Sequence, residues 1–319
     1  MDGRKAAEIL LTTCVGAQSD EKILFVSDDT GAEIAEIMWR HSTGFPNRAM
    51  IRMTDRRMHG AEPPDTVAAA MAQADVIFGI TKFSLFHTAA RRNAVAGGAR
   101  FANMADYSKE MFSEGGLFVD FEKQGALMDK FSDVLEGESI RITTALGTDI
   151  TASIKGRKAI RQYGRSLKPG ASSSPPDIET AIGPLEGTAN GTAVIDGSIP
   201  FPGLGALSEH IRLTIKNGTI VKFEGGKLAE ILEKGFVELG DPAAYKLAEF
   251  GFGFNDHSTF CSRMLEDEGV MGSLHLGFGN SLSFGGNIDS NNHIDMVFTG
   301  ASVWVDDRQI MESGSHLVE

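Results

Sequence analysis

The sequence predicts an α/β protein in which a three-layer domain with a parallel sheet is followed by a β-rich domain. Two observations predict this class. Up to about residue 140, short apolar runs alternate with amphipathic helical segments, the pattern of parallel strands joined by crossover helices. Beyond that point, short alternating apolar and polar runs separated by turn residues predict mostly strands. We therefore expect an α/β domain over residues 1–140 and a β-rich domain over residues 141–319.

Strands and helices alternate through the first domain. Strands are expected at residues 22–27, 48–53, 75–80 and 100–103, and helices at residues 31–40, 65–72, 86–96 and 124–135. We expect Asp65 to cap the second of these helices, since a carboxylate can accept hydrogen bonds from the free N–H groups of the first turn.

Polar residues follow two of these strands. The run Asp28-Asp29-Thr30-Gly31 after the first strand has no G-x-G-x-x-G pattern, so the fingerprint of a dinucleotide site is absent. After the third strand come Thr81, Lys82, Ser84 and His87. These side chains either line a cleft or, in the plainer interpretation, cap the next helix.

The second domain is expected to begin with a hairpin of residues 140–144 and 150–154, followed by a loose linker or active-site loop at residues 168–176. Further strands are predicted at residues 191–196, 211–216 and 219–224. The last two are joined by Asn217-Gly218, which favours a type I′ turn. One helix is expected to start at Asp241-Pro242 and to run through Glu249 to a stop at Gly251.

The composition excludes several classes of partner. The chain has 319 residues, a formal net charge of −13 and no stripe rich in Lys and Arg, which argues against nucleic acid and anionic membranes. No stretch approaches the roughly 20 apolar residues of a membrane span, and the N-terminus lacks the apolar core of a signal peptide. The two cysteines exclude a disulfide framework, and we expect a cytoplasmic protein.

Imidazole and carboxylate side chains gather in the last quarter of the chain. In the alternating run at residues 293–298, His293 and Asp295 point to the same face of a strand. His275 lies on a second alternating run, and Gly277 leaves room beside it. If these strands pair, the three side chains share one face, and they are ligands suited to divalent metal ions.

Other polar residues have plainer interpretations when taken singly. Glu249 is a solvated helix carboxylate, Glu268 a loop charge and His257 an exposed turn residue. Their closeness in sequence to the histidines nevertheless makes all three candidate metal ligands. In the loop at residues 175–187, Glu179 and Glu186 either contact substrate or are simply solvated.

The chain resembles metalloaminopeptidases of the aminopeptidase S and aminopeptidase T (leucyl aminopeptidase) type. The resemblance is clearest over residues 175–300, and residues 84–100 fit the nucleotide-fold-like first domain of that family. The matching stretches are residues 176–187, 193–198, 203–220, 247–255, 267–279 and 293–295.

This resemblance implies a metal-dependent hydrolase with two zinc, cobalt or manganese ions, in which a metal-activated water attacks an amide. It implies that Glu249 bridges the ions, that Glu268 and His275 bind one, and that His293 and Asp295 bind the other. Glu249 and Glu268 are then catalytic as well. That family has a tyrosine where this chain has Leu282, which predicts poor hydrolysis of simple aminoacyl amides.

The same superfamily contains 2,5-dihydroxypyridine 5,6-dioxygenase, which the chain also resembles, particularly at residues 255–257, 277–286 and 293–295. That resemblance implies one Fe(II) held by His257, His293 and Asp295, as a facial triad with open positions for oxygen. Retention of Glu268 and His275 favours the hydrolase, whereas His257 and the missing tyrosine favour the dioxygenase. In either case we expect a small-molecule or peptide substrate and a homo-oligomer, here a dimer.

Overall fold

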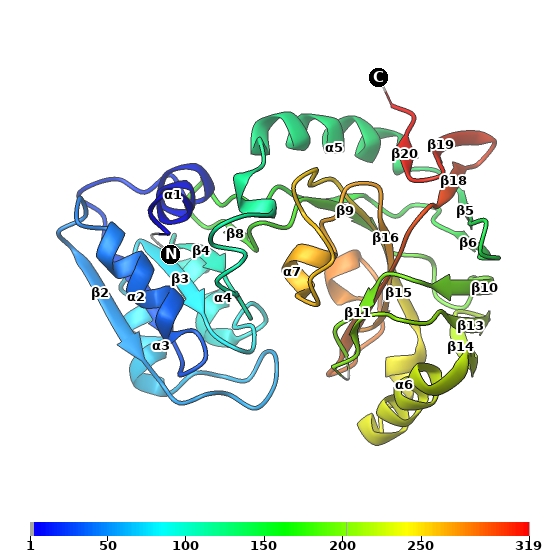
Figure 1. Cartoon of the computed structure of the whole chain (residues 1–319), viewed down its shortest axis with the longest axis horizontal. Coiled ribbons are helices and arrows are strands. Elements are labelled where there is room, and N and C mark those ends of the chain that lie inside the picture. The colour runs from blue at the N-terminus through cyan, green and yellow to red at the C-terminus, as the bar shows by residue number, and fades with distance from the viewer. Residues whose placement is uncertain (1–2, 202, 319) are drawn as a thin grey trace. The chain divides into compact units, whose positions relative to one another are not determined.

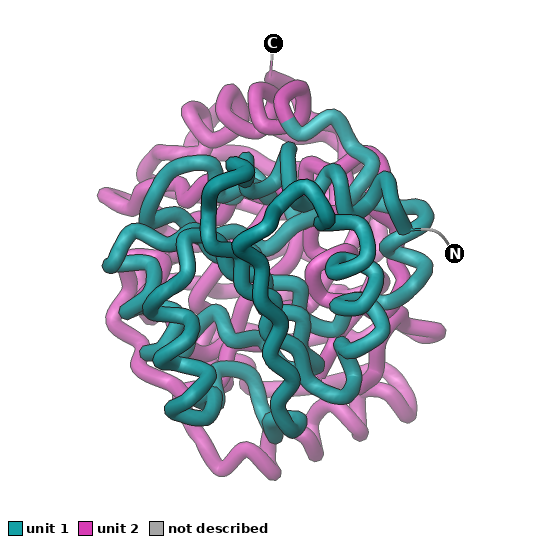
Figure 2. The backbone as a smooth tube through the Cα atoms, turned by 90° about the vertical axis from the view of Figure 1, so that its left-hand side faces the viewer, with its two compact units in different colours: residues 1–121, 162–177 teal, residues 122–161, 178–319 magenta. Residues whose placement is uncertain are grey.

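The computed structural model describes residues 3–201 and 203–318. The chain divides into two compact units, each built from two stretches of sequence. Unit 1 comprises Met1–Phe121 and Gln162–Asp177, and unit 2 comprises Glu122–Arg161 and Ile178–Glu319 (Figure 2). In the described ranges no helix has the length and apolar character needed to cross a membrane.

Unit 1 contains a five-stranded sheet in the order β2-β1-β3-β4-β8, and all four of its pairings are parallel. Its strands are β1 (Ile23–Ser27), β2 (Arg48–Arg52), β3 (Val76–Ile80), β4 (Arg100–Asn103) and β8 (Ser172–Ser173). Its helices are α1 (Arg4–Glu8), continued by a π-helix (Ile9–Cys14), α2 (Ala32–His41), α3 (Asp65–Met71) and α4 (Ala89–Ala96), with a 3₁₀ turn at Gly116–Phe118. The first four expected strands are therefore present (Figure 1), and β8 lies within the expected linker.

Carboxylate side chains accept hydrogen bonds from the free N–H groups at the starts of two helices, α2 and α4. Asp28, which is fully buried, accepts hydrogen bonds from the N–H groups of Gly31 at 2.8 Å and Lys82 at 2.6 Å. Gly31 is the N-cap of α2, so this carboxylate occupies the place where a helix N-terminus would bind an anion. Glu62 similarly accepts from the N–H groups of Ala89 and Ala90 at the start of α4.

Two predicted caps were wrong. The cap of α4 is Thr88, whose hydroxyl accepts from the Arg91 N–H, and not one of the polar residues at 81–87. Helix α3 begins at Asp65 itself and its N-cap is Pro64, which has no side-chain acceptor. The N-cap position falls on Pro64 and not on Asp65, so the helix starts one residue earlier than a cap at Asp65 would give.

Unit 2 contains two large sheets with antiparallel pairing (Figure 1). The eight-stranded sheet has the order β14 (Thr219–Glu224), β13 (Ile211–Lys216), β10 (Asn190–Ile195), β6 (Asp149–Ser153), β5 (Ser139–Thr143), β18 (Ser302–Val305), β19 (Arg308–Glu312) and β20 (Ser315–His316). The seven-stranded sheet has the order β12 (Gly205–Ala206), β11 (Ser198–Ile199), β17 (His293–Phe298), β16 (Leu274–Gly279), β15 (Leu247–Gly253), β9 (Glu179–Ile182) and β7 (Ile160–Gln162). One parallel sheet and two antiparallel sheets make this an α/β protein, as expected.

The predicted helix through Glu249 was wrong. Asp241 does cap a helix, accepting from the Ala243 N–H at 2.9 Å, but that helix is a single 3₁₀ turn, Pro242–Tyr245. Glu249 then lies on β15, every residue of which is buried between β16 and β9. Pairing on both sides satisfies the backbone of this strand, so tertiary structure overrides the local helix pattern.

Three helices complete unit 2. They are α5 (Phe121–Leu135), α6 (Gly226–Leu239) and α7 (Met264–Asp267), with a further 3₁₀ turn at Leu282–Phe284. The sequence reasoning missed α6, which buries Ala229, Leu232 and Phe236. The hairpin before it is confirmed: Asn217 and Gly218 have φ values of 49° and 72°, as a type I′ turn requires.

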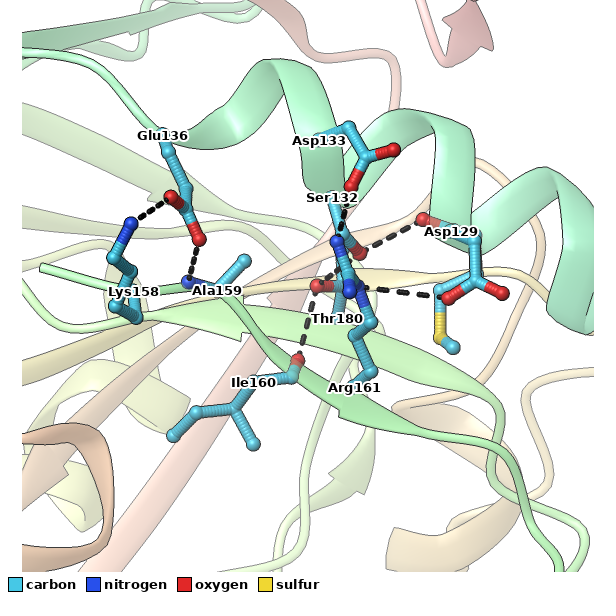
Figure 3. Close-up of polar contacts among 10 residues, drawn as sticks. Asp129, Ser132, Asp133, Glu136, Lys158, Ala159, Ile160, Arg161 and Thr180 are labelled. Atoms are coloured by element: carbon cyan, nitrogen blue, oxygen red, sulfur yellow. Dashed lines mark hydrogen bonds and ion pairs between the residues drawn. The ribbon is translucent and has the colours of Figure 1, made fainter.

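Helix α5 fastens the edge strand of the seven-stranded sheet (Figure 3). Arg161 on β7 forms ion pairs with Asp129 and Asp133, one turn apart on α5. The Thr180 hydroxyl on β9 donates to the Ile160 carbonyl at 3.0 Å. The Ser132 hydroxyl on α5 donates in turn to the Thr180 hydroxyl at 2.8 Å. The helix therefore holds both β7 and β9 in place.

Candidate metal centre

Strands β15, β16 and β17 bring residues from distant parts of the sequence to one point of the seven-stranded sheet. The register places His275 opposite Gly251, and Gly277 between Glu249 and Asp295. Side chains two residues apart on a strand share a face, so these polar groups converge. The pairing of β16 with β17 that the sequence analysis required is therefore present.

The first group consists of Glu249, His293 and Asp295, whose ligand atoms lie within 4.8 Å of one another. His293 Nε2 is 2.8 Å from Glu249 Oε2 and 3.2 Å from Asp295 Oδ1. Both carboxylates are buried, with side-chain exposures of 3% and 9%. One imidazole and two carboxylates arranged around a point form a suitable ligand set for a divalent ion.

A second group of Glu179, Glu249 and His275 also lies within 4.8 Å. His275 Nε2 is 3.5 Å from Glu179 Oε2 and 3.4 Å from Glu249 Oε1. Glu249 thus presents one oxygen to each group. This is the arrangement of a carboxylate that bridges two ions.

Two glycines make the space for these side chains. A Cβ on Gly251 would lie 2.0 Å from His275 Nε2. A Cβ on Gly277 would lie 2.8 Å from His293 Nε2 and 2.9 Å from both Asp295 Oδ1 and the Cβ of Glu249. The sequence analysis expected Gly277 to leave room beside His275. In the structure it leaves room for the first group instead.

The electrostatics of the groups favour a cation. Burial would lower the pKa of His275, but a hydrogen bond that the imidazole donates to Glu249, together with the charges of Glu179 and Glu249, outweighs it and raises the pKa to about 9. Burial would also lower the pKa of His293. The charges of Asp295 and Glu249 and the hydrogen bonds to them outweigh burial, so the pKa of His293 lies well above its usual value. In the described part of the chain, His275 Nδ1 is buried without a hydrogen-bond partner. Buried carboxylates this close together require a positive charge between them, and the residues fit a metal ion.

The ring of His293 is oriented by the segment between β16 and β17. Its Nδ1 lies 2.9 Å from the Asn280 carbonyl oxygen, which can only accept, so Nδ1 carries the proton. The ring of Phe284 stacks on the imidazole with centroids 5.3 Å apart and planes 21° apart. Nε2 therefore faces the carboxylates with its lone pair available to an ion.

The remaining predicted site residues lie in different surroundings. Glu268 is buried and hydrogen-bonded to Asp295, and one of its oxygens lies within 4.8 Å of one on Glu179. His257 joins none of the three-residue groups among the described residues; its side chain is 51% exposed and contacts Asp256 at 2.9 Å. Glu186 binds Arg157 at 2.8 Å.

The sequence analysis placed Glu179 in a substrate loop, whereas it lies on β9 within the second group. The pattern that points to it is the run Glu179–Ile182, four buried residues headed by a carboxylate. A charge at the end of a fully buried strand needs a partner.

Comparisons with known proteins give one family. A family model described as 2,5-dihydroxypyridine 5,6-dioxygenase matches residues 16–318. The 2,5-dihydroxypyridine 5,6-dioxygenase of Pseudomonas putida KT2440 is 26% identical over 189 residues, which cover 56% of this chain and 54% of that protein. The chain thus matches about half the length of this curated relative.

Two solved structures share the fold. The 2,5-dihydroxypyridine dioxygenase of Pseudomonas putida KT2440 superposes with a TM-score of 0.82 at 17% identity, covering 99% of this chain and 97% of that one. AmpT from Thermus thermophilus superposes with a TM-score of 0.71 at 13% identity, covering 99% of each chain. The family match is to the dioxygenase and not to the aminopeptidases that the sequence analysis placed first, and AmpT shares the fold.

Proposed function

The chain belongs to the 2,5-dihydroxypyridine 5,6-dioxygenase family, and from this premise we propose that it is a metal-dependent dioxygenase that opens a hydroxylated nitrogen-containing aromatic ring. The observation that carries the proposal is the match of the family model to nearly the whole chain. His293 and Asp295 lie within the matched residues and contact each other in the first group. The substrate is a small molecule.

In this proposal the first group holds one Fe(II). His293 and Asp295 are two of its ligands, and Glu249 is the third, in place of the half-exposed His257. When bound, Fe(II) would supply a place for a ring hydroxyl and oxygen to meet, beside the side chains of the first group. Glu268, hydrogen-bonded to Asp295, is placed to hold a proton beside the ligands.

The test is reconstitution under anaerobic conditions. Protein loaded with Fe(II) is mixed with 2,5-dihydroxypyridine and oxygen, and the ring absorbance and oxygen consumption are followed together. We expect equal consumption of both, and loss of both in His293→Ala and Asp295→Ala. Turnover that is unchanged in these two variants would overturn the proposal, as would an active protein without iron.

A second candidate function is metal-dependent hydrolysis of an amide, and one observation favours it. Glu249 is shared by both groups, and His275 and Glu179 complete a second ligand set next to the first. Two ions about 3.5–4 Å apart can activate a water and polarise a carbonyl. Under this candidate two equivalents of zinc, cobalt or manganese bind per chain, and Glu179→Gln removes one equivalent and the activity. One equivalent of iron in the purified protein contradicts it.

A further inference from the structure

The segment between β16 and β17, residues 280–292, reaches His293 at two points. The Asn280 carbonyl accepts from Nδ1, and the Phe284 ring covers one face of the imidazole. The direction of His293 Nε2 therefore depends on where this segment, here called the β16–β17 loop, is held. A metal ligand whose second nitrogen is fixed in this way loses affinity when the fixing group moves.

One anchor of the β16–β17 loop is Asp241. Its Oδ2 accepts from the Ser290 hydroxyl at 2.6 Å and from the Asn292 amide at 3.3 Å. These contacts hold the end of the loop that leads into β17. They leave the other half, which carries Phe284, to be held elsewhere.

The second anchor is Glu186. Its Oε1 accepts from the Asn287 N–H at 2.7 Å. A Cβ on Gly286 would lie 2.8 Å from the same oxygen and 2.1 Å from Ser281 Oγ, so the loop passes directly over the carboxylate. The contact is too close for any residue but glycine.

Arg157 fixes Glu186. Its Nη2 lies 2.8 Å from Glu186 Oε2, and the two side chains are only 11% and 27% exposed. Ion pairs with so little exposure are weakly screened by solvent. Removing one partner leaves the other charge partly buried and uncompensated, so we expect this pair to influence local structure more than an exposed pair does.

We propose that Arg157 and Glu186 are positioning residues of the metal centre. They hold the β16–β17 loop, and through Asn280 and Phe284 they keep His293 Nε2 directed at the ion. The inference rests on the proposed function only for the presence of a metal at His293. It gives Glu186 a role other than the substrate contact that the sequence suggested.

The experiment measures cobalt(II) binding by calorimetry, together with the visible spectrum of the bound ion. Arg157→Met removes the charge from Glu186, and Glu186→Gln keeps the acceptor for Asn287 but weakens the grip of Arg157. We expect cobalt affinity to fall at least about tenfold in each, with a shifted spectrum. Arg157→Lys keeps a cation at this position and is expected to recover part of the affinity.

An exposed pair of the same unit provides the matched control. Arg141 binds Asp149 at 2.9 Å, with both side chains 56% exposed. Arg141→Met is expected to bind cobalt like the unaltered protein, since exposed pairs contribute little. Circular dichroism and thermal unfolding of every variant identify any loss of fold, and Glu186→Gln is the variant least prone to it because it changes no shape.

The outcomes separate the positioning role from the proposed function. Unaltered affinity and spectrum in folded Arg157→Met and Glu186→Gln would overturn the positioning role. A loss in Arg141→Met equal to that in Arg157→Met would also overturn it, because any ion pair would then have the same effect. Cobalt binding by the unaltered protein without ring opening by the iron form refutes the proposed function alone, whereas no metal binding refutes both.

Discussion

Replacement of Gly251 by alanine tests which of the two ligand groups the protein uses. The new Cβ would lie 2.0 Å from His275 Nε2 and 2.2 Å from Cε1. To reach an ordinary contact of 3.4 Å, one of the two atoms must move about 1.4 Å. Both residues are buried on paired strands, so the imidazole is displaced rather than the backbone, and metal ligation tolerates only about 0.2 Å.

For the proposed dioxygenase, Gly251→Ala is expected to retain one equivalent of metal and most of the activity, because His293 and Asp295 are not displaced. The overpacking is expected to cost about 1–3 kcal/mol of unfolding free energy. The assay combines metal content, ring opening and urea unfolding of the same preparation.

Gly277→Ala is the matched companion variant. Its Cβ would contact His293 Nε2, Asp295 Oδ1 and the Cβ of Glu249 at 2.8–2.9 Å, so it disturbs the first group and should remove metal and activity. The reasoning is refuted if Gly251→Ala loses as much metal and activity as Gly277→Ala. That result would show that the second group is required, as in the two-metal hydrolase.

Three further outcomes are expected. Burial lowers the pKa of His316 to about 4, and its ring stacks on Phe254. The folded state therefore favours the neutral ring. The contribution of this group to the free energy of unfolding is complete above pH 6.5 and is lost as the pH falls from 6.5 to 4. The expected loss of unfolding free energy is up to about 3 kcal/mol, and His316→Phe should abolish it. The measurement compares urea unfolding at pH 7 with urea unfolding at pH 4.5. Asp28→Ala, which leaves two N–H groups of unit 1 unpaired, should cost about 1–3 kcal/mol for each of them in the same measurement, and an unchanged midpoint contradicts the geometry. Gly218→Ala, at φ 72° and with its Cβ 3.0 Å from the Gly187 nitrogen, should lower the melting temperature by several degrees, and no shift would count against the type I′ turn.

Patterns local in sequence predicted much of this structure. The alternation at residues 293–298 placed His293 and Asp295 on one face, and the same reasoning placed His275 on the neighbouring strand. Strands β1, β3 and β4 of unit 1 were similarly visible as buried runs. In each case the period of the side chains determines both the element and the face it presents.

What depends on distant partners was not predictable. Glu249 lies in a stretch that reads as a helix until β16 and β9 pair with it on both sides. Glu179 precedes His275 by almost a hundred residues, and only the order β16-β15-β9 brings them together. His257, grouped with the histidines because it is near them in sequence, lies at an exposed turn. Nearness along the chain is a poor guide where ligands come from different strands of a sheet.

The position of Glu249 in both ligand groups has a thermodynamic consequence. Two cations that share one carboxylate cannot bind independently, because each alters the charge and the direction of the oxygens that the other uses. By linkage, the factor by which an ion in one group changes the affinity of the other group is the same in both directions. In a protein with both groups occupied, a change in Glu179 or His275 therefore alters metal affinity at His293 without touching that residue. Substitutions in one ligand group can therefore change which metal the other group prefers.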